Sequence, residues 1–149
     1  FDHERYSTLP RQYAWHTRSS WRFQSKARTT AFAMSSGPTT GRFVICGKSP
    51  ATGLWAEANI GGFWGPELRK AGFDGLWVTG IAAQPVYLFV NEGRLEVRDG
   101  ANVWGQDIYQ AQDSVKKEIG VKGAHVAVIG QAGECGVLYA SIGCDHGRF

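Results

Sequence analysis

The segment NIGGFWGPELRKAGFD, residues 59–74, joins a glycine cluster directly to a short predicted helix. Pro66 falls in the first turn of that helix, where a proline is tolerated because the missing N–H would have no partner within the helix. Glu67 in the same turn and Lys70 near the other end both suit the helix dipole, and Gly72 suits the C-terminal cap. The segment therefore predicts a glycine-rich turn followed by a helix that ends near Gly72.

Runs of apolar residues on either side of this segment predict six β-strands. Two of them form a hairpin across Glu92-Gly93, a two-residue connection typical of antiparallel strands. In this hairpin Leu95 and Val97 alternate with charged neighbours, as expected of a strand that buries one face. The six strands are expected at residues 42–46, 75–79, 85–91, 94–98, 124–129 and 137–142.

A second helix is predicted over residues 106–119, and Gly120 ends it. Its apolar residues recur at the spacing of one helical face; they are Ile108, Ala111, Val115 and Ile119. Glycine-rich residues 130–134 separate the last two predicted strands. This order of elements favours an α+β fold with mostly antiparallel β-sheets and two short-to-medium helices.

Residues 1–30 differ from the rest of the chain, because they show no helical or strand periodicity. Six basic and two acidic residues give them a charge of +4, so that the remainder is close to neutral, at −1, in a chain of formal charge +3. We therefore expect an atypical, poorly ordered basic leader at 1–30 and one compact domain at 31–149. Since the basic excess belongs to the leader, no nucleic-acid partner is expected.

The three cysteines, Cys46, Cys135 and Cys144, are an odd number and include no C-x-x-C pair. This pattern argues against a disulfide framework and against the cysteine sets of zinc or iron–sulfur sites. No apolar run approaches 18 residues, and residues 1–30 lack the apolar stretch of a secretory signal. The sequence therefore predicts a cytoplasmic protein with no membrane-spanning segment.

Few residues suggest catalysis. His125 begins a predicted strand without a partner at metal-ligand spacing, and the adjacent side chains of Asp145-His146 are not expected to face each other. Cys144 near His146 would suit a thiol nucleophile, but no sequence cue indicates an oxyanion site. The stretch GQAG at residues 130–133 lacks the glycine spacing of a dinucleotide fingerprint and is expected to precede a strand instead of a helix. No catalytic residue is therefore assigned.

Residues suited to bind phosphate are also present, but they are scattered along the chain. Arg42 opens a strand, residues 59–62 lead into a helix start, and Arg148 follows a second glycine-rich stretch. Arginine offers a planar fork suited to phosphate, and glycine lets the backbone approach an anion closely. These residues alone are better explained as tight turns with surface arginines.

Six segments resemble, in order and spacing, those of the aldehyde ferredoxin oxidoreductase family, whose members use a tungsten or molybdenum bis-pterin cofactor. The resemblance runs from about Ala31 to Phe149. The matching segments are residues 38–43 (PTTGRF), 48–53 (KSPATG), 59–74, 85–88 (PVYL), 98–105 and 129–134 (IGQAGE).

In that family this domain forms a base beneath the cofactor, whose metal is held by pterin sulfurs. The resemblance implies that Arg42, Asn59, Gly61, Arg148 and Phe149 contact the pterins. It also implies that the backbone carbonyls of Asn59 and Phe149 bind a Mg²⁺ ion that bridges the pterin phosphates.

For the full-length enzyme, the resemblance implies oxidation of an aldehyde to a carboxylic acid, with a 4Fe–4S cluster passing electrons to ferredoxin. The partners expected are therefore the remaining domains, ferredoxin and an aldehyde, and a homodimer is left open. Two alternatives stand beside this function: a benzoyl-CoA reductase-type subunit of the same family, and a non-catalytic remnant domain.

The chain also departs from the family pattern. The usual amino-terminal strand and its Gly-Gly-Arg-Gly segment are replaced by the basic leader, and Phe149 stands where alanine is usual. The ligands of the iron–sulfur cluster are absent from this chain. We therefore expect a truncated amino-terminal domain that is not active alone.

Overall fold

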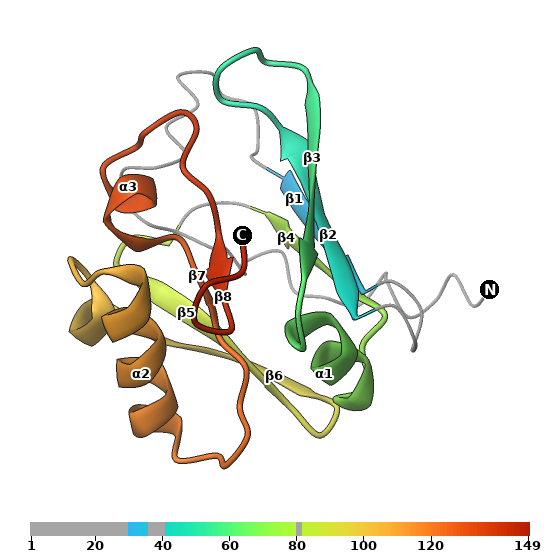
Figure 1. Cartoon of the computed structure of the whole chain (residues 1–149), viewed down its shortest axis with the longest axis vertical. Coiled ribbons are helices and arrows are strands. Elements are labelled where there is room, and N and C mark those ends of the chain that lie inside the picture. Colours follow the sequence, from blue (N-terminus) through green and yellow to red (C-terminus); the bar gives the residue numbers. More distant parts are fainter. Residues whose placement is uncertain (1–29, 36–40, 80–81) are drawn as a thin grey trace.

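The computed structural model describes residues 30–35, 41–79 and 82–149 (Figure 1). The predicted leader, apart from Thr30, lies outside the described residues. A four-stranded antiparallel sheet forms one half of the molecule, in the order β3-β2-β1-β4. Its strands are β1 (Thr30–Ser35), β2 (Arg42–Lys48), β3 (Trp55–Gly61) and β4 (Gly75–Thr79). β3 is therefore an edge strand, paired on one side by β2.

Helix α1 (Trp64–Lys70) follows β3 after two residues, which confirms the helix predicted there. Gly72 has a φ of 93° directly after the C-cap residue Ala71, as a helix-ending glycine should. Gly65 brings the helix close to the sheet, because a Cβ atom at this position would lie 2.8 Å from the carbonyl oxygen of Arg42.

The other half contains the predicted hairpin, formed by β5 (Val86–Asn91) and β6 (Arg94–Asp99). The long helix α2 (Ile108–Ile119) is also confirmed. The Asp107 side chain accepts hydrogen bonds from two amides in the first turn of α2, and Gly120, with a φ of 62°, ends this helix. The short elements are η2 (Ala101–Val103), β7 (Ala127–Val128), α3 (Gly130–Glu134) and β8 (Gly143–Cys144). No helix of the described residues is long and apolar enough to cross a membrane.

The α+β class is confirmed, but four details of the prediction are wrong. β1 was not among the predicted strands. β3 was not predicted, because its first five residues are exposed and show no alternation. Residues 130–134 form a third helix, so that a helix and not a strand follows β7. The strand expected at 124–129 is reduced to the two residues of β7, which pair with β8, and no strand forms at 137–142, where Val137, Leu138 and Tyr139 are exposed.

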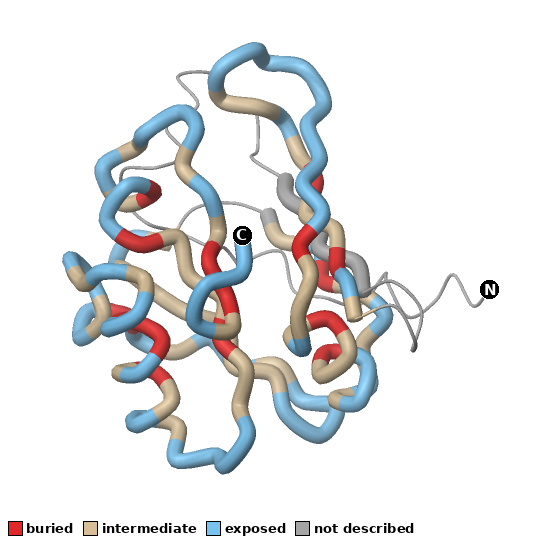
Figure 2. Tube along the Cα trace, viewed as in Figure 1, coloured by how far each residue is buried: buried red, intermediate tan, exposed pale blue. Residues whose placement is uncertain are grey.

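The main core lies where the last segment of the chain meets the sheet (Figure 2). Phe43 and Ile60 are opposite each other on β2 and β3, and Cys144 of β8 packs against them. Trp64 of α1 stacks on Phe43 with ring centroids 4.7 Å apart. The end of β3, the start of α1 and the segment from residue 143 are thereby packed together.

Candidate functional site

The β2–β3 ladder places three of the predicted residues on one face of the sheet. Arg42 is directly opposite Gly61, and directly opposed residues of an antiparallel pair point to the same face. Asn59 lies two residues before Gly61 and so points to that face as well. The Arg42 guanidinium donates a hydrogen bond of 3.0 Å to Oδ1 of Asn59. This pair forms a polar surface beside a glycine that has no side chain to cover it.

Arg148 reaches the same place from the far end of the chain. A Cβ atom on Gly61 would lie 4.0 Å from Nη1 of Arg148, and one on Gly62 would lie 2.9 Å from its Cδ. The structure therefore brings together Arg42, Asn59, Gly61 and Arg148, which the sequence predicted to share a site. We call this group the polar edge.

The backbone of the polar edge also faces outward. The Gly62 amide donates to the Gly41 carbonyl, so that alternate residues of β3, counted back from Gly62, hydrogen-bond to β2. Asn59 and Gly61 lie between those positions, and their carbonyls therefore point away from β2. The Gly61 carbonyl accepts a long contact of 3.8 Å from the Cys144 thiol. The Asn59 carbonyl, predicted to bind Mg²⁺, thus faces the open edge of the sheet.

Phe149 is the fifth predicted residue and lies next to Arg148. Its ring packs back toward β8, since a Cβ atom on Gly143 would lie 3.2 Å from Cε1 of Phe149. More than half of the residue's surface is exposed. The structure therefore places Phe149 at the border of the polar edge.

The Cys144 thiol is a poor nucleophile in this setting. Burial, with a smaller contribution from the Asp145 carboxylate, raises its pKa to about 11, while Arg148 acts in the opposite direction. The thiol therefore stays protonated at neutral pH, and a protonated thiol is unreactive. Its role is to pack in the core and to contact the Gly61 carbonyl.

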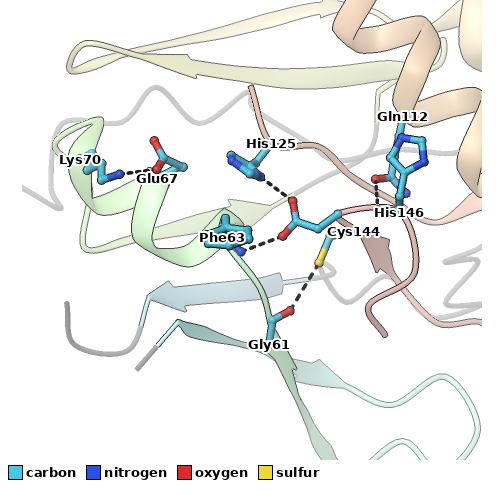
Figure 3. Close-up of polar contacts among 9 residues, drawn as sticks. Gly61, Phe63, Glu67, Lys70, Gln112, His125, Cys144 and His146 are labelled. Carbon is cyan, nitrogen blue, oxygen red and sulfur yellow. Dashed lines mark hydrogen bonds and ion pairs between the residues drawn. The ribbon is translucent and has the colours of Figure 1, made fainter. Parts of the chain in front are cut away.

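Asp145 is the residue that sequence reasoning missed. Its Oδ1 lies 2.5 Å from Nδ1 of His125, and its Oδ2 accepts a hydrogen bond of 2.7 Å from the Phe63 amide (Figure 3). These partners are 20 and 82 residues away in the sequence, so no local pattern could have indicated them. The expectation that Asp145 does not pair with His146 is correct.

His146 makes different contacts on the other side of the same turn. Its amide donates to Oε1 of Gln112, at 3.1 Å, and its Nε2 lies 2.7 Å from Oδ1 of Asp113. Gln112 is fully buried in α2 and also donates to the Ile108 carbonyl. Residues 144–146 thus contact three separate parts of the chain. Within the described residues, no three acidic, histidine or cysteine side chains form a metal-binding group.

The glycine-rich stretch after β7 has a structural role. Glu134 of α3 accepts a hydrogen bond of 2.8 Å from the Gly105 amide, and Gln131 donates one of 2.6 Å to the Gly105 carbonyl. Burial raises the pKa of Glu134, whereas the bond from Gly105 lowers it. With five residues and without the glycine spacing, α3 does not form a dinucleotide site.

A cavity of about 380 Å³ lies between α1, the β5–β6 hairpin and α2. Most of its walls are apolar, with Tyr87, His125 and Glu134 among the polar residues. None of the five predicted cofactor residues lines it. The polar edge and this cavity are therefore separate features.

Comparisons with known proteins agree on one family. Residues 28–149 match the family model described as aldehyde ferredoxin oxidoreductase, N-terminal domain. The chain is 43% identical over 108 residues to the tungsten-containing aldehyde ferredoxin oxidoreductase of Pyrococcus horikoshii, which covers 72% of this chain and 18% of that protein. It is 41% identical over 114 residues to the enzyme of the same description from Thermococcus kodakarensis, and this match covers 76% of the present chain and 19% of that protein.

A solved structure is also similar. The active-site complex BamBC of benzoyl-coenzyme A reductase, in complex with 1,5-dienoyl-CoA, superposes with a TM-score of 0.76 and 35% identity. This match covers 80% of the present chain and 19% of that one. The chain thus spans about a fifth of the length of the relatives it matches. From the match over residues 28–149 and the identity above 40%, the chain belongs to the aldehyde ferredoxin oxidoreductase family.

Proposed function

We propose that this domain holds the pterin part of a tungsten or molybdenum cofactor, with the polar edge as the contact surface. The observation that carries the proposal is the meeting of Arg42, Asn59 and Arg148 around Gly61, although they come from distant parts of the chain. Arginine and amide side chains are suited to bind phosphate and the polar rim of a pterin ring.

The geometry fits a phosphate-bearing group in two further respects. The bare Gly61 lets such a group approach the strand, and the outward Asn59 carbonyl offers the hard oxygen ligand that Mg²⁺ prefers. In this proposal the carbonyls of Asn59 and Phe149 would hold a Mg²⁺ ion, which would neutralise part of the phosphate charge of the pterins. The two arginines neutralise the remaining phosphate charge.

When bound, the cofactor supplies the redox chemistry, and the domain orients it. For the complete enzyme we propose oxidation of aldehydes to carboxylic acids, with electrons passing through a 4Fe–4S cluster to ferredoxin. The relatives named tungsten-containing aldehyde ferredoxin oxidoreductase, at 41–43% identity, support this proposal. The cluster ligands and the substrate pocket would then lie in other domains, in a cytoplasmic protein that is either a monomer or a homodimer.

Replacing Arg42 tests the cofactor proposal. The complete enzyme would be purified from a host that makes the cofactor, and its tungsten, molybdenum and pterin contents would be measured. Arg42→Ala should lower the contents of both metal and pterin. Leaving a desolvated anion without its charged partner costs about 2–5 kcal/mol of binding free energy. Arg42→Lys should restore part of it, since lysine keeps the charge without the planar fork.

Arg69→Ala is the matched control, because Arg69 is an exposed arginine that pairs with Asp74 at 3.0 Å on the far end of α1. It should leave the cofactor content unchanged. Full cofactor content in Arg42→Ala would refute the role of Arg42. A wild-type protein without metal or pterin would instead favour the remnant domain.

A second candidate activity has an observation of its own. The benzoyl-coenzyme A reductase complex is similar in structure over four-fifths of the chain, at 35% identity. The same polar edge would then serve a subunit that reduces an aromatic acyl-CoA. Assays of the complete, cofactor-loaded enzyme with aldehydes and with benzoyl-CoA, each with a suitable redox dye, distinguish the two activities.

A further inference from the structure

We infer that Asp145 is a positioning residue for Arg148: held between His125 and the Phe63 amide, its carboxylate fixes where the arginine lies beside Gly61. This inference rests on the proposed function of the polar edge, because it concerns how one of its residues is placed. Asp145 itself does not belong to the polar edge.

The Asp145 carboxylate is held by contacts on both of its oxygens. Its side chain is only 8% exposed, and each oxygen has a different partner. Oδ2 accepts from the Phe63 amide at the junction of β3 and α1, and Oδ1 pairs with His125, which precedes β7 (Figure 3). The Phe63 ring also packs against the His125 ring, with centroids 5.3 Å apart. One carboxylate therefore joins the end of β3 to the start of β7.

Asp145 is linked to Arg148 through the backbone of the turn. Backbone hydrogen bonds of 2.9 Å in both directions join Cys144 to Arg148, so the intervening residues form a closed turn. Within it Asp145 and His146 have φ values of 46° and 53°, in the left-handed region that residues with side chains rarely adopt. Such a turn persists only where contacts hold it, and any shift of Asp145 would carry Arg148 with it.

Asp145 and Arg148 also lie against the same glycine, Gly62. A Cβ atom on Gly62 would collide with Oδ2 of Asp145 and with Cδ of Arg148. Both side chains therefore pack directly against the backbone at the end of β3, which carries Asn59 and Gly61. Asp145 sets the distance of the turn from that backbone.

Asp145 could affect anion binding as a repelling charge or as a positioning residue, and these two roles predict opposite effects when the carboxylate is removed. A carboxylate repels phosphate, so removing its charge would by itself strengthen anion binding. If the carboxylate positions Arg148, removing it should weaken anion binding. Asp145→Asn separates the two effects: its oxygen can accept from Phe63 and its amide can donate to Nδ1 of His125, so the geometry is kept while the charge is lost.

The test is a calorimetric titration of the protein with Mg²⁺ and pyrophosphate, a probe with two phosphates bridged by a metal. Arg148→Ala should weaken binding about tenfold or more, as loss of a charged anion contact does. Asp145→Ala should weaken it about tenfold, the usual size of the loss when a residue that orients a ligand-binding group is removed. Asp145→Asn should bind as tightly as the wild type or more tightly. Asp74→Ala, which removes an exposed carboxylate paired with Arg69, should have no effect.

The double variant Asp145→Ala/Arg148→Ala decides between positioning and an independent effect. If Asp145 acts through Arg148, the double variant should bind no more weakly than Arg148→Ala. Fully multiplicative losses would overturn the inference, and so would a folded Asp145→Ala that binds as the wild type does. If the wild type does not bind the probe, or if Arg148→Ala binds normally, the proposed site itself is refuted, and the inference with it.

A second variant covers the case in which Asp145→Ala does not fold, as judged by circular dichroism. His125→Ala removes one of the two partners of the carboxylate and leaves the Phe63 hydrogen bond. It should weaken pyrophosphate binding, and only when Arg148 is present. Unchanged binding in a folded His125→Ala, together with an unfolded Asp145→Ala, would overturn the inference.

Discussion

Strand β3 and the turn at residues 144–148 border the same polar edge but are held in different ways. β3 is fixed by its backbone, because all seven of its residues are in register with β2. The turn is closed by its own backbone hydrogen bonds, but side chains hold it against the rest of the molecule, through Cys144, Asp145 and the Gln112 contact of His146. One half of the site should therefore tolerate side-chain changes, while the other half should depend on a few buried polar groups.

Gly62 lies where the two regions meet, and its replacement should have the largest effect. A Cβ atom on Gly62 would collide with Asp145 and Arg148, and the residue has a φ of 136°. Gly62→Ala should lower the free energy of unfolding by on the order of 3 kcal/mol, from backbone strain and overpacking together. Urea denaturation measures this loss.

The neighbouring glycine is the control. A Cβ atom on Gly61 would lie 4.0 Å from Arg148, an ordinary contact, and Gly61 has no positive φ. Gly61→Ala should therefore change the stability by only about 0.5 kcal/mol. Equal losses for the two variants would contradict the tight approach of the turn to Gly62.

An intermediate effect is expected at Gln112, which supports the turn from α2. Its side chain is fully buried, and Oε1 accepts the hydrogen bond of the His146 amide. Gln112→Leu has a similar size but leaves that amide without an acceptor, which should cost about 1–3 kcal/mol. Gln110→Leu, on the exposed side of the same helix, should change the midpoint of urea unfolding much less. A stable Gln112→Leu variant would mean that the turn does not need this support.

The smallest effect concerns the Cys144 thiol, whose pKa is raised from 9.0 to about 11. Because the folded value is the higher one, the thiol's contribution to stability is complete below pH 9 and is lost as the pH rises through 11. The wild type should therefore lose more stability than Cys144→Ser between these pH values. Cys135→Ser, which changes an exposed thiol, should behave as the wild type does. Identical pH profiles for all three proteins would contradict this prediction.

Local patterns in the sequence were sufficient for about half of the fold. The β5–β6 hairpin and α2 were predictable because turn residues and apolar spacing mark them within a few positions. β3 was missed because it is mostly exposed, and its pairing is decided by β2 instead of by its own pattern. Residues 137–142 have the composition of a strand but no neighbouring strand to pair with among the described residues.

The same distinction applies to the site. Arg42, Asn59, Gly61 and Arg148 could be named in advance because a family pattern marks them, and the structure brings them together. Their predicted contact with a pterin is still a prediction. Asp145 could not be found, because its partners are set by the tertiary fold and lie 20 and 82 residues away.

The separation in sequence of the two halves of the polar edge has a consequence for how the protein matures. Loop closure over more than 80 residues is entropically costly and slow compared with the formation of a local hairpin such as β2–β3. The sheet can therefore form before the turn that carries Arg148 docks on it. A cofactor that needs both halves can be inserted only after that docking. Only fully folded molecules would then take up the cofactor.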